Sequence, residues 1–235
     1  MQTTDDPATD PQSVRATLLD AALTHVAFDG WTPATFDAAV RDTGISAEAA
    51  RDACPRGALD LAVAFHRRGD ALMRDRLQST DMTAMRIREK VTCAVRARIE
   101  VAADREAVRR GTTLFALPQH AAEGAALIWG TADAIWTALG DPSDDINWYT
   151  KRATLSGVYG STVLFWLGDT SDGFGATWAF LDRRIEDVMR IEKLKAQVRE
   201  NPLLKPLMAG PNWLASRIKA PNPPTGMPGR WDDAR

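Results

Sequence analysis

Residues 13–57 predict three short helices in close succession, because residues that start or stop helices bound each of them. The first helix has apolar residues at three- and four-residue steps and ends at Gly30, which can adopt a left-handed conformation. Thr32 caps the second helix, with Pro33 at its first position, and Ser46 caps the third. This segment therefore favours a small helical bundle.

The pattern resembles a helix-turn-helix of the tetracycline-repressor kind, in which the third helix would contact DNA. Residues 37–54 carry four acidic residues against two basic ones, and the third helix offers Glu48, Arg51 and Asp52. A DNA-reading helix needs cations, because neutralising phosphates supplies much of the affinity. We therefore expect a degenerate helix-turn-helix that packs as a bundle and binds no nucleic acid.

The remainder of the chain also predicts helices and almost no sheet. The 235 residues are 45% hydrophobic, and few segments alternate with period two. Helical periodicity predicts helices over residues 58–78, 86–103, 104–115, 121–139 and 147–167, and another from Trp178. The expected fold is an all-α, tetracycline-repressor-like bundle. Its expected divisions are a disordered lead (1–12), the helix-turn-helix subdomain (13–57), a lipid-binding bundle (58–200), a basic amphipathic segment (201–220) and a disordered tail (221–235).

The sequence contains no recognisable targeting or membrane-spanning segment. Its first twelve residues are acidic and polar, unlike secretory signals or basic transit peptides. The longest strongly apolar run, residues 163–167, is far shorter than the ~20 residues that a spanning helix needs. We expect a cytoplasmic protein.

Small residues interrupt the predicted 147–167 helix, and aromatic residues surround it in the sequence. Glycine in a helix costs stability, so close approach of another helix or an open volume beside the backbone should compensate. The segment therefore belongs either to an ordinary core or to the wall of an internal lipid pocket. The candidate lipid-binding residues, chosen by size and helical phase, are Trp129, Trp136, Gly157, Gly160, Leu164 and Phe165.

Two adjacent aromatic residues begin the same helix, Trp148 and Tyr149, followed by Lys151 and Arg152. Adjacent helical residues point about 100° apart, so both aromatic side chains cannot face one core stripe. At least one should be exposed. Exposed aromatic residues beside cations form either a partner-binding hot spot or a cap on the preceding loop.

The C-terminal part of the chain is basic and amphipathic. Residues 190–219 hold seven basic residues against two acidic ones, interspersed with apolar residues. Such a segment either lies on an anionic membrane surface or folds back on the body as a hydrophobic hook. The candidate membrane-binding residues are Arg190, Lys193, Leu194, Lys195, Leu203, Leu204, Lys205 and Trp213.

Signatures of catalysis are scarce. The sequence lacks a glycine-rich phosphate loop, a GxSxG elbow and a CxxC pair. Its three histidines, His25, His66 and His120, are isolated, and the paired ExxH repeats of a di-iron site are absent. We expect neither a catalytic site nor a metal site.

Three runs carry a family resemblance: LLDAALTHVAFDGW, DINWYTKRATLSGVYGSTVLFWLGD and TWAFLDRRIEDVMRIEKLKA. In this order and spacing the chain resembles the Coq-nine family of ubiquinone-biosynthesis accessory proteins, in its bacterial form, over most of residues 13–220. The resemblance implies a repressor fold that does not read DNA and a hydrophobic cavity for a lipid or quinone intermediate, with no other cofactor. It implies a carrier rather than an enzyme, one that presents lipid to the di-iron hydroxylase of demethoxyubiquinone.

The resemblance also implies which parts of the chain bind the hydroxylase and the membrane. The adjacent aromatic residues of the family form part of the hydroxylase-binding surface, which corresponds to Trp148 and Tyr149 here. Members dock on membranes through a C-terminal amphipathic segment, so we expect a peripheral position at the inner membrane. This chain departs from the mitochondrial members because prolines break residues 200–219.

Two other hypotheses remain from the residues alone. One is a DNA-binding regulator of the tetracycline-repressor type that senses a hydrophobic ligand, with a dimer partner compensating for the acidic N-terminal face. The other is a purely structural partner of biosynthetic proteins that holds no ligand. The expected assembly is a homodimer.

Overall fold

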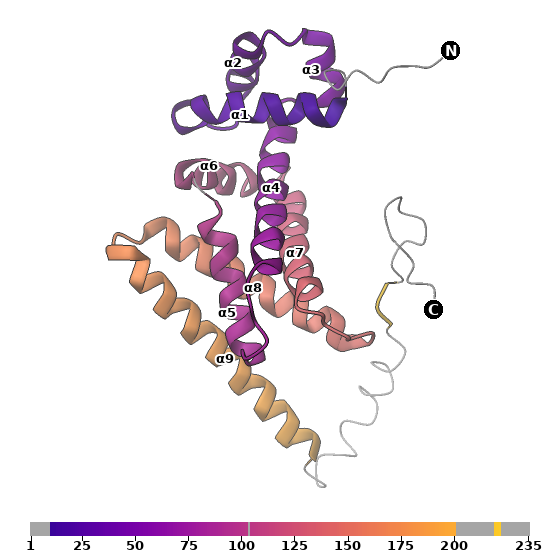
Figure 1. The fold of residues 1–235 in the computed structure, drawn as a ribbon, viewed down its shortest axis with the longest axis vertical. Coiled ribbons are helices and arrows are strands. Elements are labelled where there is room, and N and C mark those ends of the chain that lie inside the picture. The colour runs from indigo at the N-terminus through magenta and orange to yellow at the C-terminus, as the bar shows by residue number, and fades with distance from the viewer. Residues whose placement is uncertain (1–9, 103, 201–218, 222–235) are drawn as a thin grey trace.

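The computed structural model describes residues 10–102, 104–200 and 219–221, and for residues 191–200 it describes the backbone alone. Within these residues the regular structure is entirely helical, with nine α-helices and one short 3₁₀ helix (Figure 1). The prediction of an all-α fold is therefore confirmed. Of the tail predicted over residues 221–235, residues 222–235 lie outside the described residues.

The first three helices begin where their capping residues predict. The Thr32 side chain accepts a hydrogen bond from the Thr35 amide at 3.4 Å, and that of Ser46 accepts one from the Ala49 amide at 3.2 Å. The first helix starts two residues before the expected boundary, because Asp10 caps it with proline in the first turn. These helices are α1 (Pro11–Asp29), α2 (Pro33–Thr43) and α3 (Ala47–Ala53).

Helix α4 (Ala58–Gln78) links the α1–α3 group to the rest of the bundle and has the predicted bounds. In Figure 1 it runs from the α1–α3 group into the larger group of helices, where it lies beside α7. The following helices are α5 (Ile87–Glu100), α6 (Arg105–Phe115), α7 (Ala121–Ala138), α8 (Ile146–Gly168), η1 (Asp172–Phe174) and α9 (Gly175–Glu200).

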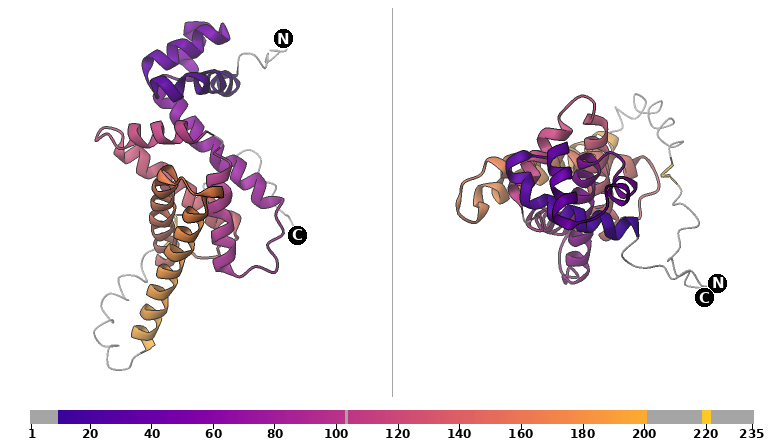
Figure 2. Two further views of the ribbon diagram at one scale, coloured as in Figure 1. Left: turned by 90° about the vertical axis from the view of Figure 1, so that its left-hand side faces the viewer. Right: turned by 90° about the horizontal axis from the view of Figure 1, so that it is seen from above.

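The junction between α8 and α9 contains the turn η1, which the sequence did not predict. The carboxylate of Asp169 accepts hydrogen bonds from the amides of Ser171 and Thr177 and from the Thr177 hydroxyl. These bonds hold the pKa of Asp169 well below its usual range. Helix α9 consequently begins at Gly175, and its far end extends beyond the other helices (Figures 1 and 2).

Two hydrophobic cores meet along α4. Leu61 belongs to the core that α1–α3 build around Leu18, and Met73 belongs to the core of α5, α7, α8 and α9 around Ile135 and Leu181. All five side chains are fully buried. Because one helix serves both cores, the N-terminal helices are packed onto the bundle rather than tethered by a flexible linker.

The helical glycines predict opposite responses to the same substitution. A Cβ atom at Gly124 would lie 2.7 Å from the Cβ of Phe115, whereas one at Gly157 would meet nothing within 4 Å. Gly157→Ala should raise the free energy of unfolding by about 0.5–1 kcal/mol, because alanine loses less backbone entropy. Gly124→Ala should lower it by about 1–3 kcal/mol through overpacking. Denaturant unfolding of both variants measures this, and equal effects would contradict the packing described here.

Candidate functional site

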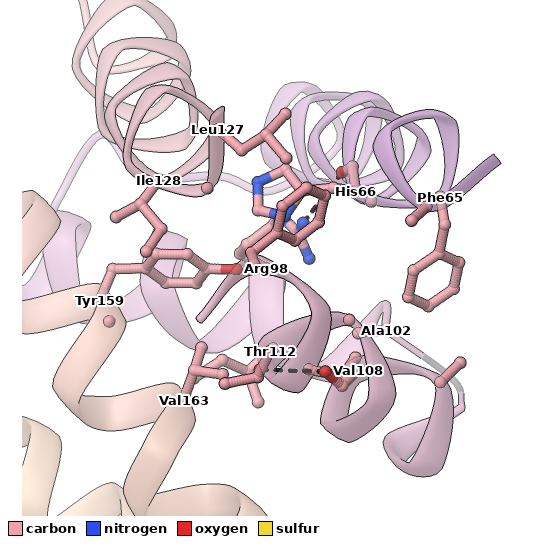
Figure 3. A pocket seen from close by; sticks show the side chains of 18 of the residues that line it. Phe65, His66, Arg98, Ala102, Val108, Thr112, Leu127, Ile128, Tyr159 and Val163 are labelled. Atoms are coloured by element: carbon pink, nitrogen blue, oxygen red, sulfur yellow. Dashed lines mark hydrogen bonds between the residues drawn. The ribbon is translucent and has the colours of Figure 1, made fainter. Parts of the chain in front are cut away.

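A cavity of about 790 Å³ lies among α4, α5, α6, α7 and α8 (Figure 3). Most of its wall is apolar and comes from segments far apart in the sequence. The volume falls in the range of pockets that hold small hydrophobic ligands. The apolar wall includes Phe65, Leu72, Val108, Leu127, Ile128 and Val163.

Two leucines mark where the cavity meets solvent. Leu72 of α4 and Leu164 of α8 both line the cavity, yet they are 45% and 60% exposed. Single exposed apolar side chains are common, but exposed apolar side chains that border an apolar hollow can mark a binding groove. The two exposed leucines therefore give the cavity an apolar opening to solvent.

Polar residues interrupt the apolar wall, including His66 of α4, Arg98 of α5 and Tyr159 of α8. Asp70 of α4 and Thr131 of α7 are buried and complete a polar cluster with them. Arg98 Nε donates to Asp70 Oδ1 at 2.6 Å, and Thr131 Oγ1 donates to the same oxygen at 2.8 Å. His66 Nε2 lies 2.9 Å from Thr131 Oγ1. Arg98 Nη2 also donates to the His66 carbonyl at 2.9 Å. The cluster thus ties α4, α5 and α7 together at the cavity.

Burial changes the protonation of two of these groups. Desolvation, reinforced by the Arg98 charge, lowers the pKa of His66 to about 4. Burial also raises the pKa of the Tyr159 phenol. At neutral pH His66 is therefore an uncharged imidazole and Tyr159 a protonated phenol.

The residues chosen as lipid-binding candidates divide between several places. Gly160 and Leu164 line the cavity. Trp136 lines a second cavity of about 500 Å³ between α5, α7, α8 and α9. The other three candidates, Trp129, Gly157 and Phe165, line neither cavity. The Trp129 ring lies beside the Trp148 ring, and Gly157 is exposed. The Phe165 ring stacks on that of Phe180.

The aromatic and small residues of the sequence did not point to the polar cluster. A signal did exist in the sequence. Arg98 lies three residues after Val95 on the apolar stripe of α5, and Asp70 lies three residues before Met73 on that of α4. Ionisable residues on a buried stripe require partners, so two of them predict a buried pair.

The Trp148–Tyr149 surface is an edge-to-face aromatic pair near the start of α8. The two rings meet edge to face with centroids 4.8 Å apart, and the Arg152 guanidinium lies 3.9 Å from the Trp148 ring centroid. Both aromatic side chains are half-buried. The Tyr149 hydroxyl donates to the Lys219 carbonyl at 3.3 Å, and the Ala220 amide donates to that of Asp144. The chain near residue 220 therefore returns to this surface.

The two neighbouring cations both form ion pairs with aspartates of the protein. Arg152 is 3% exposed and pairs with Asp133 at 2.6 Å and with Asp141 at 3.2 Å. Lys151 Nζ donates to Asp141 at 2.6 Å. Removing one partner of a buried ion pair is strongly destabilising. Arg152 therefore supports the fold beneath Trp148, whatever else it contacts.

The membrane-binding candidates lie mostly outside the description. Arg190 is exposed and pairs with Glu186 at 2.8 Å. Lys193, Leu194 and Lys195 lie in α9 where the backbone alone is described, and Leu203, Leu204, Lys205 and Trp213 lie outside the described residues. None of the helices that the structure describes has an apolar stretch that would cross a bilayer.

The helix that corresponds to a DNA-reading helix exposes an acidic surface. Glu48, Arg51 and Asp52 of α3 are all exposed. Arg15 of α1, a further cation nearby, donates to the Ala53 carbonyl at the end of α3 and is thereby occupied. The exposed side chains of α3 therefore carry a net negative charge.

The lowered pKa of His66 predicts a specific dependence of stability on pH. The unfolded state, with a histidine pKa near 6.5, binds more protons than the folded state between pH 6.5 and 4. The contribution of neutral His66 is therefore present above pH 6.5 and is lost as pH falls toward 4, by up to about 3 kcal/mol. Denaturant unfolding at several pH values should show that His66→Gln removes this part of the slope.

His120→Gln provides the matched control, because the His120 side chain makes no capping hydrogen bond at α7. The control should keep the slope of the unsubstituted protein. An unchanged slope in His66→Gln would contradict a neutral, buried His66.

The chain is similar in sequence to proteins named for ubiquinone biosynthesis. The COQ9 family model matches residues 121–192. The protein named ubiquinone biosynthesis protein COQ9, mitochondrial, from Rattus norvegicus is 30% identical over 199 residues, which cover 80% of this chain and 62% of the rat protein. Its counterpart from Drosophila melanogaster is 30% identical over 190 residues, covering 79% and 58%. The chain thus spans about three fifths of the length of these relatives.

The fold has a solved counterpart. The crystal structure of the TetR transcriptional regulator from Nitrosomonas europaea superposes with a TM-score of 0.61 and covers 75% of this chain and 97% of the regulator. At 19% identity this likeness shows a tetracycline-repressor-like fold and nothing of function. The sequence matches, taken by themselves, make the chain similar to the COQ9 family, over residues 121–192 for the family model and over about four fifths of the chain for the rat and fly proteins.

Proposed function

We propose that this protein is a non-catalytic lipid carrier of ubiquinone biosynthesis. It holds an isoprenoid quinone intermediate in the 790 Å³ cavity and presents it, at a membrane surface, to the hydroxylase that acts on demethoxyubiquinone. The relatives' names supply the pathway, and the resemblance described above supplies the hydroxylase.

The observation that carries this proposal is the apolar cavity with its leucine-lined opening. Each Å² of apolar ligand surface removed from water contributes about 25 cal/mol, so a buried isoprenoid tail offsets the cost of ordering it. Leu72 and Leu164 lie where the tail would pass from a membrane or partner into the interior.

Two further features are consistent with a carrier. The half-buried Trp148–Tyr149 surface offers aromatic side chains that a partner can cover, and aromatic residues dominate binding hot spots. The basic composition of residues 190–219 suits an anionic headgroup layer, which would place the protein peripherally at the membrane. The homodimer remains a prediction.

The competing hypothesis of a DNA-binding regulator is not favoured. The exposed acidic side chains of α3 would repel a phosphate backbone, so specific DNA binding would need cations from elsewhere. The likeness to a TetR regulator concerns the fold alone.

Blocking the cavity should reduce the lipid that the protein carries. Gly160 lines the cavity and Gly157, one turn earlier on α8, meets nothing within 4 Å. Gly160→Leu should lower co-purified lipid several-fold, because the new side chain occupies ligand volume, while Gly157→Leu should leave it unchanged. Native mass spectrometry and lipid extraction measure the occupancy. Equal lipid in both variants, or a ligand-free unsubstituted protein, would refute the carrier proposal.

Removing the aromatic surface should weaken partner binding and spare lipid binding. The double substitution Trp148→Ala and Tyr149→Ala should reduce pull-down of the hydroxylase at least tenfold, because hot-spot aromatic residues each contribute about 2 kcal/mol or more. Phe28→Ala is the control, since Phe28 is an aromatic residue that is 85% exposed and lies on α1 rather than α8.

Lipid content and thermal unfolding of the double variant show whether the change is local. Undiminished pull-down with a folded protein would exclude the aromatic pair from the interface.

A further inference from the structure

The second cavity, of about 500 Å³, shares no lining residue with the first. Its wall contains large apolar side chains that the rest of the protein covers only in part. Ile87 at the start of α5 is 49% exposed, and Trp136 of α7 and Val188 and Met189 of α9 are half-buried. These four side chains define the α5–α9 groove. Apolar side chains gathered at a hollow mark a place where an apolar segment can bind.

The chain leaves the groove at one point and returns to it at another. Helix α9 continues for eleven residues after Met189, which carries it about 16 Å beyond the groove. Figure 1 shows this far end of α9 beyond the other helices. The chain is back by residue 220, because the Ala220 amide donates to the Asp144 carbonyl at 2.8 Å. Asp144 lies in the sequence between Pro142 and Asn147, and both of these line the second cavity.

The length of residues 201–218 suits a path along the groove. These eighteen residues connect the end of α9 to the attachment point at Asp144. A helix rises about 1.5 Å per residue and an extended chain about 3.3 Å, so the segment can span between about 27 and 60 Å. Either span exceeds the ~16 Å by which α9 passes Met189. The segment is therefore long enough to return along the groove.

The composition of the segment also matches the groove. Residues 201–219 hold three basic residues and no acidic one. The loop between α7 and α8, at the rim of the groove, exposes the carboxylates of Asp144 and Asp145, which complement this charge. The apolar side chains available to fill the groove are Leu203, Leu204, Leu207, Met208, Trp213, Leu214 and Ile218.

We propose that, in the absence of a membrane, residues 201–218 bind in the α5–α9 groove of their own chain. Attachment at both ends favours this occupant over a second copy, because a tethered segment has an effective concentration in the millimolar range. Its apolar side chains cover Ile87, Val188 and Met189, and its basic side chains remain at the acidic rim. The groove is separate from the lipid cavity, so this inference does not depend on the carrier function.

Photocrosslinking of the full chain tests the proposal. The photoreactive residue p-benzoylphenylalanine replaces Trp213, and isotope-labelled and unlabelled proteins are mixed before irradiation in buffer. Peptide mapping should find crosslinks to the peptides that contain Ile87, Val188 or Met189, within single chains. The matched control carries the same photoreactive residue in place of Trp231, beyond the attachment at residue 220, and should give several-fold fewer of these crosslinks.

The variant Ile87→Asp tests the groove itself. Ile87 is 49% exposed and is the first residue of α5, where a carboxylate suits the helix dipole, so the variant should unfold at an unchanged temperature. The probe at position 213 should then crosslink to Val188 and Met189 several-fold less. An unchanged yield in this folded variant would overturn the proposal.

Three other results would also overturn it. Crosslinks between labelled and unlabelled chains would show that the groove binds a second copy. Groove crosslinks no more abundant than those of the Trp231 control would show that the segment lies elsewhere. Crosslinks formed only to lipid, in vesicles of phosphatidylcholine and phosphatidylglycerol, would assign the segment to the membrane alone.

Discussion

The buried ion pair between Asp70 and Arg98 is the constraint around which the rest of the bundle is arranged. Each charge would be costly to bury alone, so α4 and α5 must approach closely enough for the two side chains to meet at 2.6 Å. Gly69 permits this approach, since a Cβ atom there would lie 2.6 Å from Arg98 Nη1. Thr131 joins α7 to the same carboxylate. The pair thus fixes three helices that border the cavity.

The position of this pair along α4 connects fold to site. The same helix carries Leu61 into the N-terminal core and Met73 into the C-terminal core, with His66 and Asp70 between them. The cavity opens at that transition, where neither core fills the space. Close packing elsewhere makes such a volume an exception that calls for a ligand.

Local features of the sequence were enough to predict where the helices lie, but they were not enough to predict which residues line the cavity. Caps such as Thr32 and Ser46 act through neighbouring amides, so the starts of α2 and α3 followed from them directly. The cavity depends on which faces of distant helices meet. Helical phase alone placed Gly160 and Leu164 correctly beside it, but it could not distinguish them from Phe165, one residue further, which stacks on Phe180 instead. The turn η1 escaped prediction because Asp169 caps across eight residues.

The same limit applies to the Trp148–Tyr149 surface. The sequence left two roles open for Trp148 and Tyr149, a partner-binding interface and a cap on the preceding loop. The structure has features of both roles. Trp148 packs on Arg152, which anchors the loop through Asp141, while both aromatic side chains keep exposed area. A surface that is preorganised in this way loses little entropy when a partner covers it.

The central claim is that the cavity between α4 and α8 holds an isoprenoid. Photolabelling with a diazirine-bearing isoprenoid, followed by peptide mapping, tests it most directly. The account predicts crosslinks to residues of the cavity wall, such as Leu72, Ile128 and Val163, and their loss in competition with unlabelled lipid. Crosslinks confined to the second cavity, at residues such as Val91 and Met189, would contradict it.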